Sequence, residues 1–167
     1  MAIKILPDSF DPAAEGFGTW SPDGLALIFS SNRKGHYGLY RKSRDGTGAE
    51  ELLYEDAESR FTTSWSPDGE FLLYTVQLGG WREMRVLPLT PPRPGATRTP
   101  YPWAAPGTRA SLGQFSPNGK WIVYTSREAG QVEVNLAPFP GPGGTRQVSP
   151  AGGNYPRWRR DGKRFSS

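Results

Sequence analysis

Cysteine is absent from the 167 residues, and histidine occurs only once, as His36. Without cysteine the chain can form no disulfide, no thiolate nucleophile and no cysteine-based metal site. A lone histidine in the segment SNRKGHYG (31–38) would need partners to bind a metal or to act as a base. We therefore expect His36 to be an exposed loop residue, and the sequence predicts no metal site around it.

The sequence also lacks the short motifs that mark common enzyme sites. It contains no G-x-S-x-G nucleophile elbow, no phosphate-binding Walker motif and no G-x-G-x-x-G between a strand and a helix. The glycine-rich segment PGPGG (140–144) is followed by no predicted helix whose N-terminus would hold a phosphate, which favours a turn. The chain is therefore expected to carry no catalytic set and no cofactor.

Long hydrophobic runs are missing as well. No stretch approaches the roughly 18 apolar residues of a membrane helix. The segment MAIKILPDSF (1–10) lacks the charged and apolar regions of a signal peptide. The sequence thus predicts no membrane insertion. Taken as a complete chain the protein would be cytoplasmic, whereas a fragment would have left any targeting signal in its parent.

The sequence does contain four copies of one short turn. WSPDG occurs at 20–24 and 65–69, FSPNG at 115–119 and WRRDG at 158–162. Serine, proline and glycine at the first, second and fourth positions favour a type I β-turn. Each of the first three turns precedes a β-branched and aromatic run of strand length. These runs are LALIFSS (25–31), EFLLYTV (70–76) and KWIVYTS (120–126).

The spacing of these turns indicates a repeat architecture. The leading aromatics are Trp20, Trp65, Phe115 and Trp158, at intervals of 45, 50 and 43 residues. Periods of roughly 40 to 50 residues with several strands each are typical of propeller blades. A third strand, a turn and a short fourth strand complete the first three units. The longest interval contains a proline-rich insertion (91–106), which we expect in the connection between the third and fourth strands.

These features resemble the TolB-like (WD-repeat-like) β-propeller repeat, with matches at IFSSNRKGHYGLYRKSRDG (28–46) and FSPNGKWIVYTS (115–126). Residues 134–163 resemble such repeats at the C-terminal end of some bacterial serine/threonine kinases. The resemblance implies an all-β partial β-propeller, with about three four-stranded antiparallel blades plus the start of a fourth. The expected boundaries are an unassigned segment at 1–15, blades at about 16–59, 60–109 and 110–153, and an incomplete blade at 154–167.

An arc of this size is shorter than a closed ring, because propellers typically have four to eight blades. Uncovered blades leave strand edges that invite pairing with another chain. Three outcomes follow: a fragment of a longer protein, a homodimer that closes a ring of about six blades, or an open arc. We expect the first.

Two recurring features suggest ligands but have simpler explanations. A short polar residue recurs in the turns, as Asp23, Asp68, Asn118 and Asp161, and suits turn geometry better than a calcium site. The net charge is +4 and the pI about 9.5, with basic residues concentrated between 157 and 164. The aromatics occupy predicted core positions rather than a base-stacking platform, so no nucleic-acid partner is expected.

Candidate binding residues lie on loops and at the central channel. The first strand of a blade lines the channel, so positions ahead of the leading aromatics are expected at its mouth: Arg60, Arg109 and Tyr155. Two arginines there would suit an acidic partner segment, and the alternative is an ordinary solvated strand end. In the insertion, Tyr101 and Trp103 are candidate exposed anchors. The alternative for Trp103 is packing against its own blade.

Two functions follow from the resemblance. The first is a non-enzymatic interaction scaffold that binds a protein or peptide through its loops and channel. It would be a fragment of a larger bacterial envelope or sensor protein, periplasmic or extracytoplasmic in location. The second is the propeller domain of a prolyl-oligopeptidase-like serine peptidase, lacking its hydrolase domain.

Overall fold

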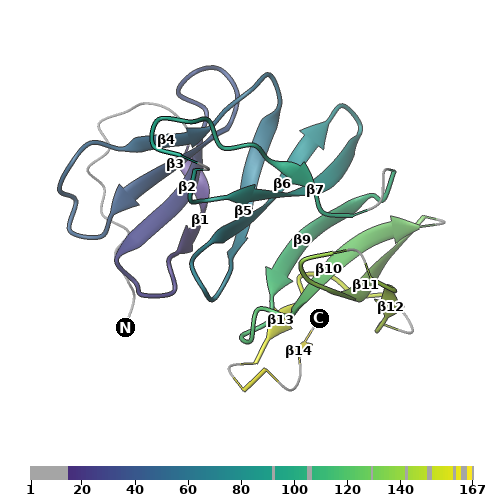
Figure 1. Ribbon diagram of the computed structural model, residues 1–167. Coiled ribbons are helices and arrows are strands. Elements are labelled where there is room, and N and C mark those ends of the chain that lie inside the picture. The colour runs from purple at the N-terminus through teal and green to yellow at the C-terminus, as the bar shows by residue number, and fades with distance from the viewer. Residues whose placement is uncertain are drawn as a thin grey trace.

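The computed structural model describes residues 15–91, 93–104, 107–128, 130–141, 143–149, 152–159, 161–162 and 165–166. These residues form three four-stranded antiparallel sheets and one two-stranded hairpin, and no helix. Figure 1 shows the sheets following one another along the chain, each with its first strand on the inner side. The all-β class and the partial propeller expected from the sequence are therefore confirmed.

The strands run in chain order across each sheet. The first sheet consists of β1 (Glu15–Trp20), β2 (Ala26–Ser31), β3 (Gly38–Ser43) and β4 (Glu51–Tyr54). The second consists of β5 (Ser59–Trp65), β6 (Phe71–Leu78), β7 (Trp81–Pro88) and β8 (Tyr101–Pro102). The third consists of β9 (Ala110–Phe115), β10 (Trp121–Glu128), β11 (Gln131–Pro138) and β12 (Arg146–Gln147). The hairpin pairs β13 (Arg157–Trp158) with β14 (Phe165–Ser166).

The fourth strand of the second sheet differs from its sequence expectation. The sequence places it at 97–101, but pairing begins only at Tyr101, opposite Val86 of β7. Pro100 has no N–H, so it cannot contribute a donor to the ladder at this position. The insertion is held instead by Arg98, whose side chain donates to the carbonyl of Leu89 (2.9 Å) and pairs with Glu51 (2.8 Å).

The recurring turn closes with the same hydrogen bonds in three copies. In the second, Gly69 N donates to Ser66 O (2.9 Å), and Gly69 has a φ of 80°, which glycine tolerates. The buried Ser66 hydroxyl donates to Asp68 and accepts from Phe71 N (2.9 Å). The first copy repeats this pattern with serine and aspartate, and the third with serine and Asn118. The recurring polar residue therefore organises the turn.

The second sheet is buried on both faces. Along β6 the side chains alternate: Leu72, Tyr74 and Val76 pack toward the first sheet, and Leu73 packs toward the third. The period of two is the reason that one strand contributes to two cores. The core between the second and third sheets includes Trp103 and Tyr124, whose rings meet edge to face at 5.1 Å.

Hydrogen bonds also cross from sheet to sheet, and each of them involves the first strand of a sheet or of the hairpin. Thr62 N of β5 donates to the Ser30 hydroxyl of β2 (3.2 Å), and Phe115 N of β9 donates to the Ser64 hydroxyl of β5 (3.1 Å). Trp158 continues the series, because its main-chain N donates to the Gln114 side chain (2.9 Å). Each blade is thus fixed to the one before it, and the hairpin is fixed to the third blade.

The inner strands contain bulges at a recurring position. In β1, Phe17 and Gly18 lie opposite one residue of β2, and in β9, Leu112 and Gly113 lie opposite one residue of β10. Phe17 and Leu112 have φ values of 53° and 55°, and Tyr155 ahead of β13 has 51°. Each stands three residues before its leading aromatic. A bulge re-aims a side chain away from the regular alternation of a strand.

The bulge in β9 brings its backbone against the second sheet. A Cβ added to Gly113 would lie 2.4 Å from Met84 Cε and 2.7 Å from Leu73 Cδ2, both in the shared core. We predict that Gly113→Ala lowers the free energy of unfolding by about 1–3 kcal/mol, as overpacked cores do. Gly144→Ala is the control, because nothing lies within 4 Å of its added Cβ. Equal stability of the two variants in urea denaturation would contradict this account.

The hydrogen bonds of the turn lead to a second prediction, which compares two variants. Ser66→Ala leaves the N–H of Phe71 without its acceptor and should cost about 1–2 kcal/mol of unfolding free energy. Asp68→Asn should stay within about 0.5 kcal/mol of the wild type, because Asn118 makes the equivalent bonds in the third copy. Thermal and urea unfolding of both variants measure the difference. A large loss for Asp68→Asn would show that the charge is needed.

Candidate functional site

Antiparallel pairing places the starts of the first and third strands of a sheet at the same edge as the end of its second strand. In the second sheet, the start of β5 lies beside the end of β6 and the start of β7. In the third, the start of β9 lies beside the end of β10 and the start of β11. The connections into β9 and β13 therefore share this face with the β6–β7 and β10–β11 turns.

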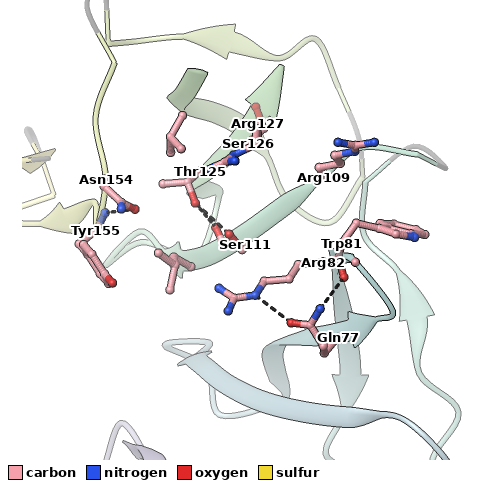
Figure 2. A pocket seen from close by; sticks show the side chains of 13 residues that line it. Gln77, Trp81, Arg82, Arg109, Ser111, Thr125, Ser126, Arg127, Asn154 and Tyr155 are labelled. Carbon is pink, nitrogen blue, oxygen red and sulfur yellow. Dashed lines mark hydrogen bonds between the residues drawn. The ribbon is translucent and has the colours of Figure 1, made fainter. Parts of the chain in front are cut away.

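A cleft of about 480 Å³ opens on this face, between the second and third sheets and the segment that leads into β13. Figure 2 shows that its side chains come from all three. The lining residues are Gln77, Gly80, Trp81, Arg82, Arg109, Ser111, Leu112, Thr125, Ser126, Arg127, Val132, Asn154 and Tyr155. The volume is in the range of clefts that hold small ligands or a few peptide residues.

Three arginines give the cleft its charge. Arg82 is the second residue of β7, Arg109 precedes β9 and Arg127 lies near the end of β10. All three are exposed. Arg82 Nε donates to Gln77 Oε1 (3.2 Å), as Figure 2 shows. No aspartate or glutamate is among the lining residues, and within the described part of the chain none of the three arginines forms an ion pair. The cleft is therefore positively charged.

Hydroxyl groups lie at the base of the cleft and are held by the third sheet. The Ser111 and Thr125 hydroxyls are 3.1 Å apart, and Thr125 Oγ1 donates to the carbonyl of Ser111 (2.9 Å). The Ser126 hydroxyl accepts from Asn135 Nδ2 (2.9 Å). A nucleophilic serine needs an adjacent base. His36 lies half-buried in the β2–β3 connection, outside the lining of this cleft. The hydroxyls therefore suit hydrogen bonding to a ligand.

Aromatic and apolar side chains complete the walls. Trp81 stands at the β6–β7 turn and is half-buried, and Tyr155 is 64% exposed. Among the described residues, Leu112 and Tyr155 are two of the three non-glycine residues with positive φ, and both line the cleft. Asn154 Oδ1 accepts from Tyr155 N (3.0 Å), which orders the main chain at this wall. Non-glycine residues held in this conformation are strained and tend to occur at functional sites.

The structure brings together two of the five residues proposed from the sequence. Arg109 and Tyr155 line the same cleft. Tyr101 is half-buried at the outer edge of the second sheet, where it packs against the core. Trp103 is 2% exposed and belongs to that core, so its proposed role as an exposed anchor is wrong. Its indole ring packs beside Tyr124 between two sheets. Burying this large apolar ring is more favourable than exposing it on the loop surface.

Arg60 is the other correction, because its side chain is 0% exposed rather than at the channel mouth. It forms an ion pair with Asp56 and donates to the carbonyl of Glu58. Its guanidinium lies 5.1 Å from the centre of the Tyr54 ring. Burial lowers the pKa of Arg60 and raises that of the neighbouring Tyr74 hydroxyl. The residue joins the first and second sheets instead of facing a partner.

Sequence reasoning missed Trp81, Arg82 and Arg127. It considered positions ahead of the leading aromatics and the proline-rich insertion, but not the turns between second and third strands. The available signal was topological: in an antiparallel blade these turns share a face with the connection into the next blade. The segments LGGWR (78–82) and SREAGQV (126–132) carry arginines at those turns.

We predict a structural role for Arg60 that stability measurements can separate from binding. Arg60→Ala removes a buried side chain and the partner of Asp56, so the unfolding free energy should fall by about 2–4 kcal/mol. Arg109→Ala is the matched control and should change it by no more than about 0.5 kcal/mol, because Arg109 is exposed. Equal urea midpoints for the two variants would refute the assignment.

The described residues contain no group of three or more His, Cys, Asp or Glu side chains placed to hold a metal ion. None of the described segments forms a helix with the length and apolarity that crossing a membrane requires.

One curated relative has a peptidase name. The uncharacterized peptidase YuxL of Bacillus subtilis is 30% identical over 138 aligned residues, which cover 64% of this chain and 21% of YuxL. The chain thus spans about a fifth of the length of that relative. No protein-family model matches the chain.

Solved structures give the fold. TolB from Acinetobacter baumannii superposes with a TM-score of 0.72 at 18% identity, over 90% of this chain and 36% of that one. A TolB-type protein of Agrobacterium tumefaciens gives 0.71 at 20% identity, over 87% and 53%. Prolyl oligopeptidase B from Galerina marginata gives 0.53 at 13% identity, over 88% and 23%. The chain therefore folds as a partial β-propeller of the TolB-like type.

Proposed function

We propose that the chain is a non-enzymatic interaction scaffold that binds a segment of a protein or peptide in the cleft between its second and third blades. The observation that carries this proposal is the cleft itself, where exposed guanidinium groups, ordered hydroxyls and two aromatic side chains converge from separate blades. Binding sites are commonly placed in this way, on connections held by a rigid scaffold. The hydroxyls have no neighbouring base among the cleft residues, which favours binding over catalysis.

The parent in this proposal is a larger bacterial envelope or sensor protein. The higher TM-scores to the two TolB structures than to prolyl oligopeptidase support it. The resemblance of residues 134–163 to repeats of bacterial kinases remains a prediction. A reading frame that joins this chain to a kinase domain and a membrane span would support the sensor version.

A second candidate is the propeller domain of a prolyl-oligopeptidase-like peptidase. The observation that favours it is the 30% identity to YuxL, which has a peptidase name. In this case the same cleft would contact substrate peptides, and the chemistry would belong to a separate hydrolase domain. A G-x-S-x-G-containing hydrolase domain in the parent reading frame would decide for this candidate.

The scaffold proposal predicts that peptides bind through the aromatic walls of the cleft. Phage-displayed random peptides selected on the chain should bind wild type at least about tenfold more tightly than Trp81→Ala/Tyr155→Ala, because buried aromatic anchors dominate interfaces. Fluorescence anisotropy with the synthesised peptides measures the dissociation constants.

Trp20→Ala/Trp121→Ala is the matched control for that experiment. Trp20 and Trp121 are 44% and 40% exposed, and neither lines the cleft. Affinity for this control should stay within about twofold of the wild type. Thermal unfolding of both double variants establishes that each is folded. The proposal fails if no peptide is enriched, or if the enriched peptides bind the two double variants equally well.

A further inference from the structure

We infer that the cleft selects acidic peptide segments, whose carboxylates pair with Arg82, Arg109 and Arg127. The inference rests on the proposed function and adds the chemical class of the partner. It is carried by the convergence of three exposed arginines on one cleft whose lining includes no aspartate or glutamate.

Among the described residues, the four buried or half-buried arginines are matched with carboxylates, whereas most of the exposed arginines are not. Arg33 pairs with both Glu15 (2.7 Å) and Glu50, and Arg85 pairs with Glu83 (2.7 Å). Arg98 and the buried Arg60 are paired as well. The chain therefore has acidic residues available to neutralise arginines that hold its strands and sheets together. Among the described residues, the cleft arginines have none.

Three unneutralised guanidinium groups around one cleft repel one another and lower the free energy of any anion that enters it. Arginine binds a carboxylate through two parallel hydrogen bonds, which are stronger than neutral ones. Arg82 belongs to the second sheet, whereas Arg127 belongs to the third. A ligand with several carboxylates along an extended chain would therefore reach arginines on both sides of the cleft.

The remaining cleft groups suit a peptide better than a nucleic acid. The bulge at Leu112 leaves main-chain groups outside the regular ladder, where a peptide backbone can pair with them. The Ser111 and Thr125 hydroxyls add short-range hydrogen-bonding groups at the base. Nucleic-acid sites instead follow a basic stripe along the phosphate backbone. The other exposed arginines near this end, Arg157 and Arg159 of the hairpin region, do not line the cleft.

The test compares three blocked, fluorescein-labelled peptides of equal length, which alternate glycine with glutamate, glutamine or lysine. Oligothymidylate of matched charge is the nucleic-acid probe. Each is titrated by fluorescence anisotropy against the whole chain and against the cleft variant Arg82→Gln/Arg109→Gln/Arg127→Gln. The control Arg44→Gln/Arg93→Gln/Arg146→Gln removes the same charge from exposed positions outside the cleft. Circular dichroism and thermal unfolding confirm that both variants are folded.

The expected result is binding of the glutamate peptide at least about tenfold more tightly than the glutamine peptide, and none of the lysine peptide. The cleft variant should lose at least about tenfold in affinity, while the control stays within about threefold. Added salt should weaken binding.

Several outcomes would overturn the inference. The glutamate and glutamine peptides could bind equally well while the phage-selected peptides still lose affinity for Trp81→Ala/Tyr155→Ala. That result would refute the acidic selectivity and leave the proposed function in place. Equal losses in the cleft and control variants mean that net charge alone attracts the peptide. Tighter binding of oligothymidylate than of the glutamate peptide assigns the cleft to a nucleic acid. Absence of binding by the glutamate peptide at millimolar concentration also refutes the acidic class, whereas the phage selection separately decides the proposed function.

Discussion

Face-to-face packing of successive sheets is the constraint on which the rest of the molecule depends. The second sheet contributes alternate residues of β6 to two cores, so it has no free face for a ligand. The inner strands add cross-sheet hydrogen bonds such as that from Phe115 N to the Ser64 hydroxyl (3.1 Å). Ligand contacts on the second sheet are therefore confined to its strand ends and turns. The cleft follows from this arrangement, because it lies where turns of adjacent blades meet (Figure 2).

The bulge near the start of the inner strands serves both packing and the site. In β9 it combines Leu112, whose φ is 55°, with Gly113, whose lack of a side chain lets the backbone lie against Met84. The glycine gives close approach to the second sheet, and the leucine becomes part of the cleft wall. A positive φ at a non-glycine residue costs of order 1–3 kcal/mol. The core contacts formed around the bulge offset that strain.

The repeat made the fold predictable, whereas the site was predictable only in part. Turn chemistry and strand composition are local, so WSPDG and the apolar runs after it indicated blades and their approximate strands. Burial depends on residues that are far apart in the sequence, and it determines whether a candidate residue lies in a core or at the cleft. Arg60 and Arg109 precede leading aromatics at similar distances, but one lies between sheets and the other beside the cleft. Trp103 illustrates the same limit, because a proline-rich surrounding sequence gives no sign that its indole completes a core.

The distribution of carboxylates follows the depth of the arginines, and the three arginines proposed to bind a ligand are among the exposed ones. A buried or bridging arginine requires a neighbouring anion or carbonyl to compensate for lost hydration, and Arg60 has Asp56 and the Glu58 carbonyl. An exposed arginine such as Arg109 keeps its hydration and needs no such partner. Its charge therefore remains available to a ligand, and pairing with a carboxylate from outside costs less desolvation than pairing in the core. Arginines that look equivalent in the sequence thus acquire different roles from the depth at which the sheets place them.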